Sequence, residues 1–271
     1  MRIEFAQIDA FARAPFTGNP AAVMPLRGWL DDAVLQAIAA ENNLSETAFL
    51  VPIAGSEDEG GDAPDFELRW FAPASEVVLC GHATLASGHF VLSADPERAR
   101  VRFRTLHSGI LEVARAETGY RMALPAWRAE PKPLPDLVTA LGLSGDLPTY
   151  WHPHRYGLVV LDSAEQVRTL DPDFRAMAKQ GDVLTIVTAP GDETDIISRA
   201  FAPGAGIDED PVTGSAHSVL VPYWAERLAR DHFTAYQASK RGGYLDCRLD
   251  GERVILGGEC VTVIEGTFLL R

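Results

Sequence analysis

Short runs of alternating apolar and polar residues dominate this chain and predict a protein rich in strands. Ile3, Phe5 and Ile8 alternate with polar neighbours near the start, as residues on one face of a strand do. Most later runs of this kind are joined by short turns that contain glycine or proline. The pattern predicts strands at residues 3–11, 21–24, 45–51, 65–71, 101–105, 109–114, 120–124, 158–161, 183–188, 196–201, 233–239, 244–249, 253–256 and 261–270.

Other segments have helical periodicity and are expected as helices at residues 31–41, 82–94, 137–143, 171–180 and 214–229. The segments at 82–94 and 214–229 are apolar almost all round, which is typical of helices surrounded by protein. The acidic and glycine residues at 54–64 indicate a loop. Because strands outnumber helices, the expected fold class is α+β. Mixed, mostly antiparallel sheets would curl round a helix, and a doubly wound parallel sheet is not expected.

The two apolar helices begin after similar turns. Residues 81–84 read GHAT and residues 214–217 read GSAH, and an acidic turn with a proline precedes each. This repeated pattern predicts two halves of like architecture. A proline-rich crossing at residues 125–135 places the halves at 1–124 and 125–271, and the last strand is free to pack back on the first half.

Composition narrows the possible partners and compartment. A formal charge of −14 argues against nucleic acid, which needs a basic face. Three cysteines without a zinc-like spacing make no disulfide framework and suggest no metal. No apolar run approaches the length of a membrane span, and the first residues do not resemble a signal peptide. A cytoplasmic protein without membrane partners is expected.

Two residues of the first half are candidates for proton chemistry. Glu46 is flanked by apolar residues, and burial would raise the pKa of its carboxyl group toward values useful for proton transfer. His82 lies at a helix start, which favours a neutral imidazole that can donate a hydrogen bond or relay a proton. A surface glutamate and a packed helix cap are the plain alternatives.

The second half offers a candidate anion site at residues 210–215. Asp210 precedes a tight turn, and Gly214 lets a ligand come close to the backbone. Thr213 and Ser215 are helix-capping residue types, and the first N–H groups of a helix attract anions. The plain alternative is an ordinary capped helix. No nucleotide-binding motif occurs in the chain, so no cofactor is expected.

Cys80 raises the possibility of a racemase that uses two cysteines. Such an enzyme needs a second thiol across the substrate, but Thr213 stands at the matching place before Gly214. Cys247 and Cys260 fall in the strands near the end of the chain. The pair is therefore missing, and Cys80 is interpreted as a small buried side chain.

Five motifs in the same order and spacing give the chain a close resemblance to a known family. They are residues 16–23 (FTGNPAAV), 43–49 (NLSETAF), 68–76 (LRWFAPASE), 80–84 (CGHAT) and 209–216 (EDPVTGSA). Together they resemble the PhzF-like family, the relatives of a phenazine-biosynthesis isomerase, which share the diaminopimelate epimerase fold. Residues 257–268 fit as well. The first helix carries GHAT where the phenazine enzyme has GHPT, which argues against the phenazine substrate but not against the chemistry.

The resemblance implies two barrel-like halves, each wrapped round a central helix, with the active site in the cleft where the two helix starts converge. It implies a cofactor-independent isomerase or epimerase that moves a proton on a small carboxylated metabolite. Glu46 would be the acid and base, assisted by His82 and Asp210. The residues implied to bind substrate are Gly81, Gly214, Ser215 and Asn19. A homodimer is a further expectation from the resemblance. The alternatives are a cysteine-based amino-acid racemase and a non-catalytic binding protein that kept the fold.

Overall fold

The computed structural model describes residues 1–54 and 63–270 of the chain. Most of the acidic loop expected at 54–64 lies outside these described residues. The chain divides into two compact units, which are residues 1–123 with 257–271, and residues 124–256. Each unit is described by itself below.

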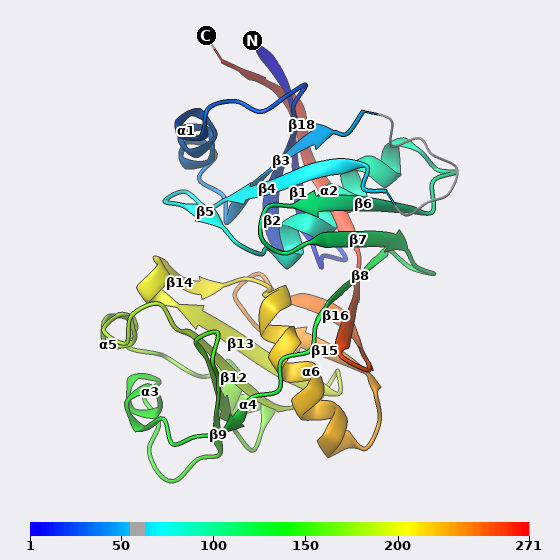
Figure 1. The fold of residues 1–271 in the computed structure, drawn as a ribbon. Coiled ribbons are helices and arrows are strands. Elements are labelled where there is room, and N and C mark those ends of the chain that lie inside the picture. The colour runs from blue at the N-terminus through cyan, green and yellow to red at the C-terminus, as the bar shows by residue number, and fades with distance from the viewer. Residues whose placement is uncertain (55–62, 271) are drawn as a thin grey trace. The chain divides into compact units, whose positions relative to one another are not determined.

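The first unit is a mixed sheet with two helices (Figure 1). Its elements are β1 (Arg2–Ala10), β2 (Asn19–Pro25), α1 (Asp32–Asn42), β3 (Glu46–Pro52), β4 (Phe66–Phe71), β5 (Glu76–Val77), α2 (Gly81–Ala94), β6 (Arg100–Thr105), β7 (Ile110–Arg115), β8 (Tyr120–Pro125) and β18 (Cys260–Leu269). The strands pair in the order β18, β1, β2, β3, β4, β6, β7, β8. Only β2–β3 and β4–β6 are parallel within this series, because α1 and α2 make the two crossovers.

Helix α2 is the centre of the first unit. It contacts β1, β2, β3, β6, β7 and β18 (Figure 1). Its buried hydroxyls are satisfied within the helix, since Thr84 and Ser87 donate to the carbonyls four residues earlier. Gly88 lets the helix approach β7 closely, because a Cβ there would lie 2.3 Å from Cγ1 of Val113. The expected apolar helix surrounded by protein is therefore present.

The second unit repeats this plan (Figure 1). Its elements are β9 (Glu130–Pro131), α3 (Pro135–Ala140), β10 (Thr149–His152), β11 (Tyr156–Val160), α4 (Ala164–Arg168), α5 (Phe174–Ala178), β12 (Leu184–Pro190), β13 (Ile196–Ala202), the 3₁₀ turn Pro203–Ala205, β14 (Ile207–Asp210), α6 (Gly214–Leu228), β15 (His232–Gln237), β16 (Gly243–Asp250) and β17 (Arg253–Gly258), whose last two residues belong to the first unit. Strands β10 to β13, β15 and β16 pair in sequence, with β11–β12 and β13–β15 parallel. The two units thus have the same order of parallel and antiparallel pairs, as the repeated sequence pattern suggests.

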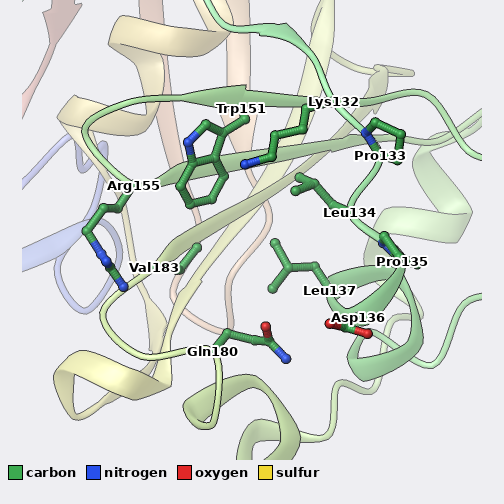
Figure 2. Close-up of a pocket in the computed structure, with 10 residues that line it drawn as sticks. All are labelled: Lys132, Pro133, Leu134, Pro135, Asp136, Leu137, Trp151, Arg155, Gln180 and Val183. Atoms are coloured by element: carbon green, nitrogen blue, oxygen red, sulfur yellow. The ribbon is translucent and has the colours of Figure 1, made fainter.

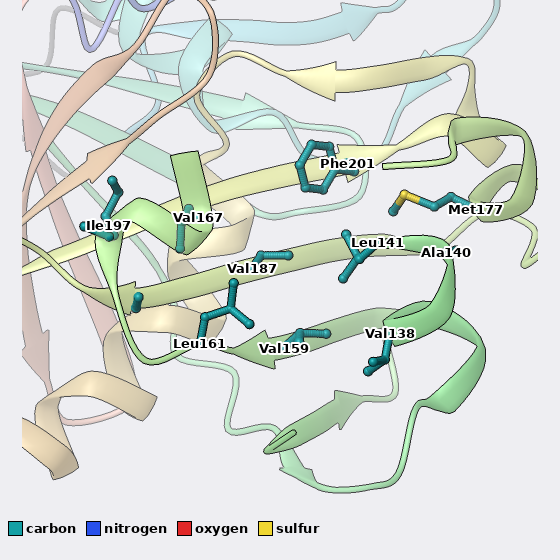
Figure 3. Packing of buried hydrophobic residues seen from close by; sticks show 12 residues of the cluster. Val138, Ala140, Leu141, Val159, Leu161, Val167, Met177, Val187, Ile197 and Phe201 are labelled. Atoms are coloured by element: carbon teal, nitrogen blue, oxygen red, sulfur yellow. The ribbon is translucent and has the colours of Figure 1, made fainter. Parts of the chain in front are cut away.

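Two layers cover the sheet of the second unit. Val187 in β12 packs in a core with residues of α3, α4 and α5 (Figure 3). The next residue, Thr188, accepts a hydrogen bond from the indole of Trp224 in α6. Because successive strand residues point to opposite faces, the short helices lie on one face of the sheet and α6 lies on the other.

Several short elements differ from the sequence-based prediction. Helix α3 overlaps the helix predicted at 137–143 but both starts and ends earlier in the chain. Helix α5 is half as long as the helix predicted at 171–180. Helix α4 and strands β5, β9, β10 and β14 were not predicted. Elements of two to five residues carry too little periodicity to be recognised, and tertiary contacts define them.

Candidate active site

Three of the predicted residues meet in the first unit. Asn19 begins β2, Glu46 begins β3, and His82 is the second residue of α2. The parallel pairing of β2 with β3, in which Ala21 lies opposite Glu46, brings the first ends of both strands together. Glu46 Oε2 lies 2.9 Å from Nε2 of His82, and the Asn19 amide lies 3.1 Å from Nδ1 of the same ring. The three side chains form one buried cluster.

A tight turn sets the position of Asn19. Gly18 has a φ of +64°, and a Cβ at this residue would lie 2.2 Å from the carbonyl oxygen of Ala10. Only glycine adopts this conformation and tolerates this approach without strain. The glycine of the FTGNP motif therefore has a structural reason, which is to deliver Asn19 to the ring of His82.

The carboxylate of Glu46 forms a buried ion pair with His82. Glu46 is 8% exposed and His82 is 4% exposed. Although the two atoms are 2.9 Å apart, Oε2 accepts no well-directed hydrogen bond from any described residue. The contact is therefore an ion pair without the angular geometry of a hydrogen bond. A buried carboxylate beside an imidazole is a pair of groups that can exchange a proton with a ligand.

The charge of His82 differs from the sequence-based expectation. Burial of the ring opposes protonation, but the adjacent Cys80 sulfur and the facing carboxylate of Glu46 together outweigh burial and hold the pKa of His82 well above its ordinary value. The expected neutral imidazole is therefore wrong. That prediction considered the position of His82 at a helix start but not its contacts with neighbouring side chains. The Asn19 side chain suits the charged ring, because an amide can turn its oxygen toward a protonated nitrogen.

Cys80 lies beside the same ring. Its Sγ is 3.5 Å from Nδ1 and 4.0 Å from Nε2 of His82. Burial, together with the nearby charge of Glu46, raises the pKa of the Cys80 thiol to about 11. The neutral thiol that results is a poor base at neutral pH. This agrees with the interpretation of Cys80 as a small buried side chain.

The remaining predicted residues lie at the start of α6 in the second unit. Asp210 ends β14, and Gly214 and Ser215 begin α6. Thr213 is the N-cap residue, but its hydroxyl donates to Oδ2 of Asp210 at 2.5 Å and makes no capping bond. The expected capping role of Thr213 is therefore wrong, because the carboxylate competes for the hydroxyl. Helix α2 also begins without a side-chain cap.

Two residues that the sequence analysis missed organise this helix start. The amide of Gln237 in β15 accepts from the Thr213 N–H at 2.9 Å and donates to the Asp210 carbonyl at 2.8 Å. The Tyr156 side chain makes a hydrogen-bonding contact with Ser215, and burial raises the pKa of the tyrosine despite that contact. Neither residue has a local motif, because both act through contacts far apart in sequence.

A separate cavity of about 300 Å³ lies in the second unit (Figure 2). It contains Lys132, whose Nζ lies 4.7 Å from the ring centre of Trp151, and also Arg155 and Asp136. None of the predicted site residues lines it. Its cations are exposed, and it holds no buried acid and base in contact, so it is not the candidate for proton chemistry.

Comparisons with known proteins agree along the whole chain. The model of the family described as "Phenazine biosynthesis-like protein" matches residues 8–266. An uncharacterized isomerase of Pseudomonas aeruginosa is 46% identical over 272 residues, with 100% of both chains covered. An uncharacterized isomerase of Halalkalibacterium halodurans is 41% identical over 270 residues, with 97% of each chain covered.

Solved structures give the same result. A phenazine biosynthesis protein of the PhzF family from Enterococcus faecalis has a TM-score of 0.89 at 42% identity, with 100% of both chains covered. A hydroxyproline epimerase from Agrobacterium vitis has a TM-score of 0.64 at 9% identity and covers 98% of this chain and 92% of its own; that likeness concerns the fold alone. The expected α+β fold is confirmed. Among the described residues, no helix has the length and apolar character needed to cross a membrane.

Proposed function

This chain belongs to the phenazine biosynthesis-like (PhzF) family, and from that premise we propose that it is a cofactor-independent isomerase moving a proton on a small carboxylated metabolite. The relatives named isomerases support the reaction class. The observation that carries the proposal is the buried carboxylate of Glu46, whose Oε2 lies 2.9 Å from the ring of His82.

In the proposed reaction, Glu46 removes a proton from carbon and returns it to a second carbon. Carbon acids are weak, so the base has to be desolvated and held in place, as Glu46 is by burial at the start of β3. The charge that develops on the substrate is stabilised by the neighbouring His82 cation. The proton leaves one carbon, rests on Oε2 and reaches the other carbon, so the reaction needs no oxidant and no cofactor.

The substrate carboxylate would bind to N–H groups at a helix start. Both α2 and α6 begin without a side-chain cap, so these N–H groups are available to a ligand. Under this proposal Gly81 serves in the first unit, and Gly214 and Ser215 serve in the second. Asp210 would hold a substrate hydroxyl or amine, because a carboxylate only accepts hydrogen bonds.

Of the two alternatives, the racemase is not favoured, because the Cys80 thiol is neutral at physiological pH and Thr213 stands at the matching place where a second cysteine would be needed. A protein that only binds would have no need of a carboxylate base. Experiment distinguishes such a binding protein from an isomerase. Its affinity for the ligand would survive removal of the Glu46 carboxylate, and it would show no turnover.

Hydrogen exchange in D2O tests the proposal. The protein is incubated with a panel of small unsaturated carboxylic acids and amino acids, and deuterium at carbon is measured by NMR. Deuterium is expected at one carbon of the substrate with the unmodified protein and with Glu41→Gln, which removes an exposed carboxylate from α1. It is expected to be lost with Glu46→Gln. Full exchange with Glu46→Gln would contradict the assignment of Glu46 as the base.

The expected homodimer is a separate prediction, which light scattering tests.

A further inference from the structure

The cavity of about 300 Å³ in the second unit combines apolar side chains with charged ones (Figure 2). Its volume is within the range of small-molecule sites in proteins. Two of its lining residues, Lys132 and Arg155, are cations, and one, Asp136, is an acid. We propose that this cavity binds a small organic monocarboxylate with an apolar body, at a site that neither Glu46 nor His82 lines.

Gly157 in β11 allows the apolar residues of the cavity to meet. A Cβ at this residue would lie 2.8 Å from Cδ1 of Leu137, 3.4 Å from Cδ1 of Leu134 and 3.9 Å from Cε3 of Trp151. These three side chains therefore converge over the backbone of β11, and they line the cavity together with Val183. The result is an apolar surface that is already formed, as in most sites for organic ligands.

Lys132 is anchored at its backbone, and its amine lies over the indole of the cavity. The Lys132 N–H donates to the carbonyl of Thr149 at 3.0 Å, and the Lys132 carbonyl accepts from the Thr149 hydroxyl at 2.6 Å. Nζ lies 4.7 Å from the ring centre of Trp151, and Figure 2 shows the side chain pointing toward that ring. The positive charge is thus directed to the cavity.

Arg155 is held in place by its backbone and by one side-chain nitrogen. Its φ is +68°, in the left-handed region, which costs free energy for a residue other than glycine and often marks a functional position. The Arg155 carbonyl accepts from the Leu184 N–H at 3.0 Å, and Nε donates to the carbonyl of Asp182. Nη1 and Nη2 make no hydrogen bond with any described residue, so they can donate to a ligand.

Neither cation of the cavity is neutralised by an internal ion pair. The chain has 38 Asp and Glu residues against 24 Lys and Arg residues, and arginines such as Arg69, Arg168 and Arg199 each contact a carboxylate. Within residues 1–54 and 63–270, no carboxylate lies at ion-pair distance from Lys132 or Arg155. Two such cations on one cavity attract an anion locally, although the whole chain is acidic.

The local charge favours a ligand with a single carboxylate. Lys132 and Arg155 together with Asp136 leave one net positive charge on the cavity, which one carboxylate cancels. A dicarboxylate or a phosphate would bring a second negative charge into a cavity that already contains Asp136. The Trp151 indole and the leucine side chains favour an apolar body such as a phenyl ring.

Fluorine NMR tests both the binding and its place. The chain has five tryptophans, and in protein labelled with 5-fluorotryptophan the Trp151 signal is assigned with Trp151→Phe. The probe is 3-phenylpropanoate, which is expected to shift the Trp151 signal in a saturable way. The neutral 3-phenylpropanamide should bind about fivefold more weakly, because it lacks the charge. Added NaCl should weaken binding of the carboxylate and not of the amide, since exposed charges are screened.

Variants identify the cations. Lys132→Met removes the amine and keeps an apolar stem over the indole, and it should weaken binding of the carboxylate about fivefold. Lys179→Met, at an exposed lysine that does not line the cavity, is the matched control and should retain the affinity. Arg155→Gln is the second variant, and its thermal unfolding midpoint shows whether it folds. Glu46→Gln should leave the Trp151 response unchanged, because this site does not depend on the proposed isomerase reaction.

Three results would overturn the proposal. The first is a Trp151 signal that does not respond to 3-phenylpropanoate, or responds equally to the amide. The second is unchanged affinity in both Lys132→Met and folded Arg155→Gln. The third is loss of the Trp151 response in folded Glu46→Gln, which would show that the probe binds elsewhere.

Discussion

His217 makes the stability of the second unit depend on pH. Its side chain is fully buried in α6, where Nδ1 donates to the Thr213 carbonyl at 2.8 Å. Nε2 has no partner among the described residues. Burial lowers the pKa of His217 to about 4, from an ordinary 6.5. The folded protein therefore needs this ring to be neutral.

The sign and size of the effect follow from linkage. The unfolded chain binds a proton at His217 below about pH 6.5, whereas the folded chain does so only below about pH 4. Acid in this window therefore favours unfolding, and stability rises with pH from 4 to 6.5. For these two pKa values the loss between pH 7.5 and pH 5.0 is roughly 2 kcal/mol. The full shift would cost roughly 3 kcal/mol near pH 4.

The assay is urea unfolding at pH 7.5 and pH 5.0, for the unmodified protein and for His217→Gln. The variant cannot titrate at this position, and its amide can still donate to the Thr213 carbonyl. Its stability should therefore change between the two pH values by roughly 2 kcal/mol less than that of the unmodified protein. His107→Gln, at an exposed histidine, serves as the control and should show the unmodified pH dependence. An identical pH dependence in His217→Gln would refute the reasoning.

Two further variants test the packing and the helix start. Gly88→Ala gains about 1 kcal/mol of helix propensity but drives a Cβ against Val113, which costs about 1–3 kcal/mol, so a net loss of stability is expected. The control is Gly28→Ala, where the Cβ meets open space and the unfolding free energy should change by less than about 0.5 kcal/mol. Equal effects of the two substitutions would contradict the close approach of α2 to β7. Gln237→Leu leaves the buried Thr213 N–H without its acceptor, so the free energy of unfolding in urea should fall by roughly 1–3 kcal/mol. The KM for the substrate should also rise. Unchanged stability would show that the turn before α6 does not depend on Gln237.

The sequence revealed the plan of the fold because that plan is local. Each central helix follows a glycine turn, and its lack of a polar face is visible within about four turns of helix. The strand pattern and the two short helix starts at Gly81 and Gly214 were recognisable for the same reason. The family resemblance is confirmed by matches over nearly the whole chain.

What the sequence did not reveal depends on contacts between distant segments. The charge of His82 depends on its contacts with Cys80 and with Glu46, which lies in another element, and a rule about helix starts alone gave the wrong state. Thr213 was expected to cap its helix, but Asp210 takes its hydroxyl. Gln237 contacts a turn more than twenty positions away and belongs to no motif. Such roles need the three-dimensional partners before they can be assigned.

The shared plan of the units makes their chemical difference informative. Asn19 begins β2 and reaches His82 in α2, while Tyr156 begins the corresponding strand β11 and reaches Ser215 in α6. Strand β3 begins with Glu46, but its counterpart β12 contains no acidic residue. The carboxylate of Asp210 accepts a hydrogen bond from the Thr213 hydroxyl at 2.5 Å.

Among the described residues, the buried pair of carboxylate and imidazole lies in the first unit, whereas the His232–Asp246 pair of the second unit is exposed. Inversion at a single carbon needs groups that remove and deliver a proton on opposite faces, whereas a shift of a proton between two carbons on one face needs a single base. The buried carboxylate of Glu46 has no counterpart in β12, which favours such a shift over an epimerisation for the proposed reaction. The second unit has a helix start without a side-chain cap, whose N–H groups can hold an anion, but no buried acid in the strand that corresponds to β3.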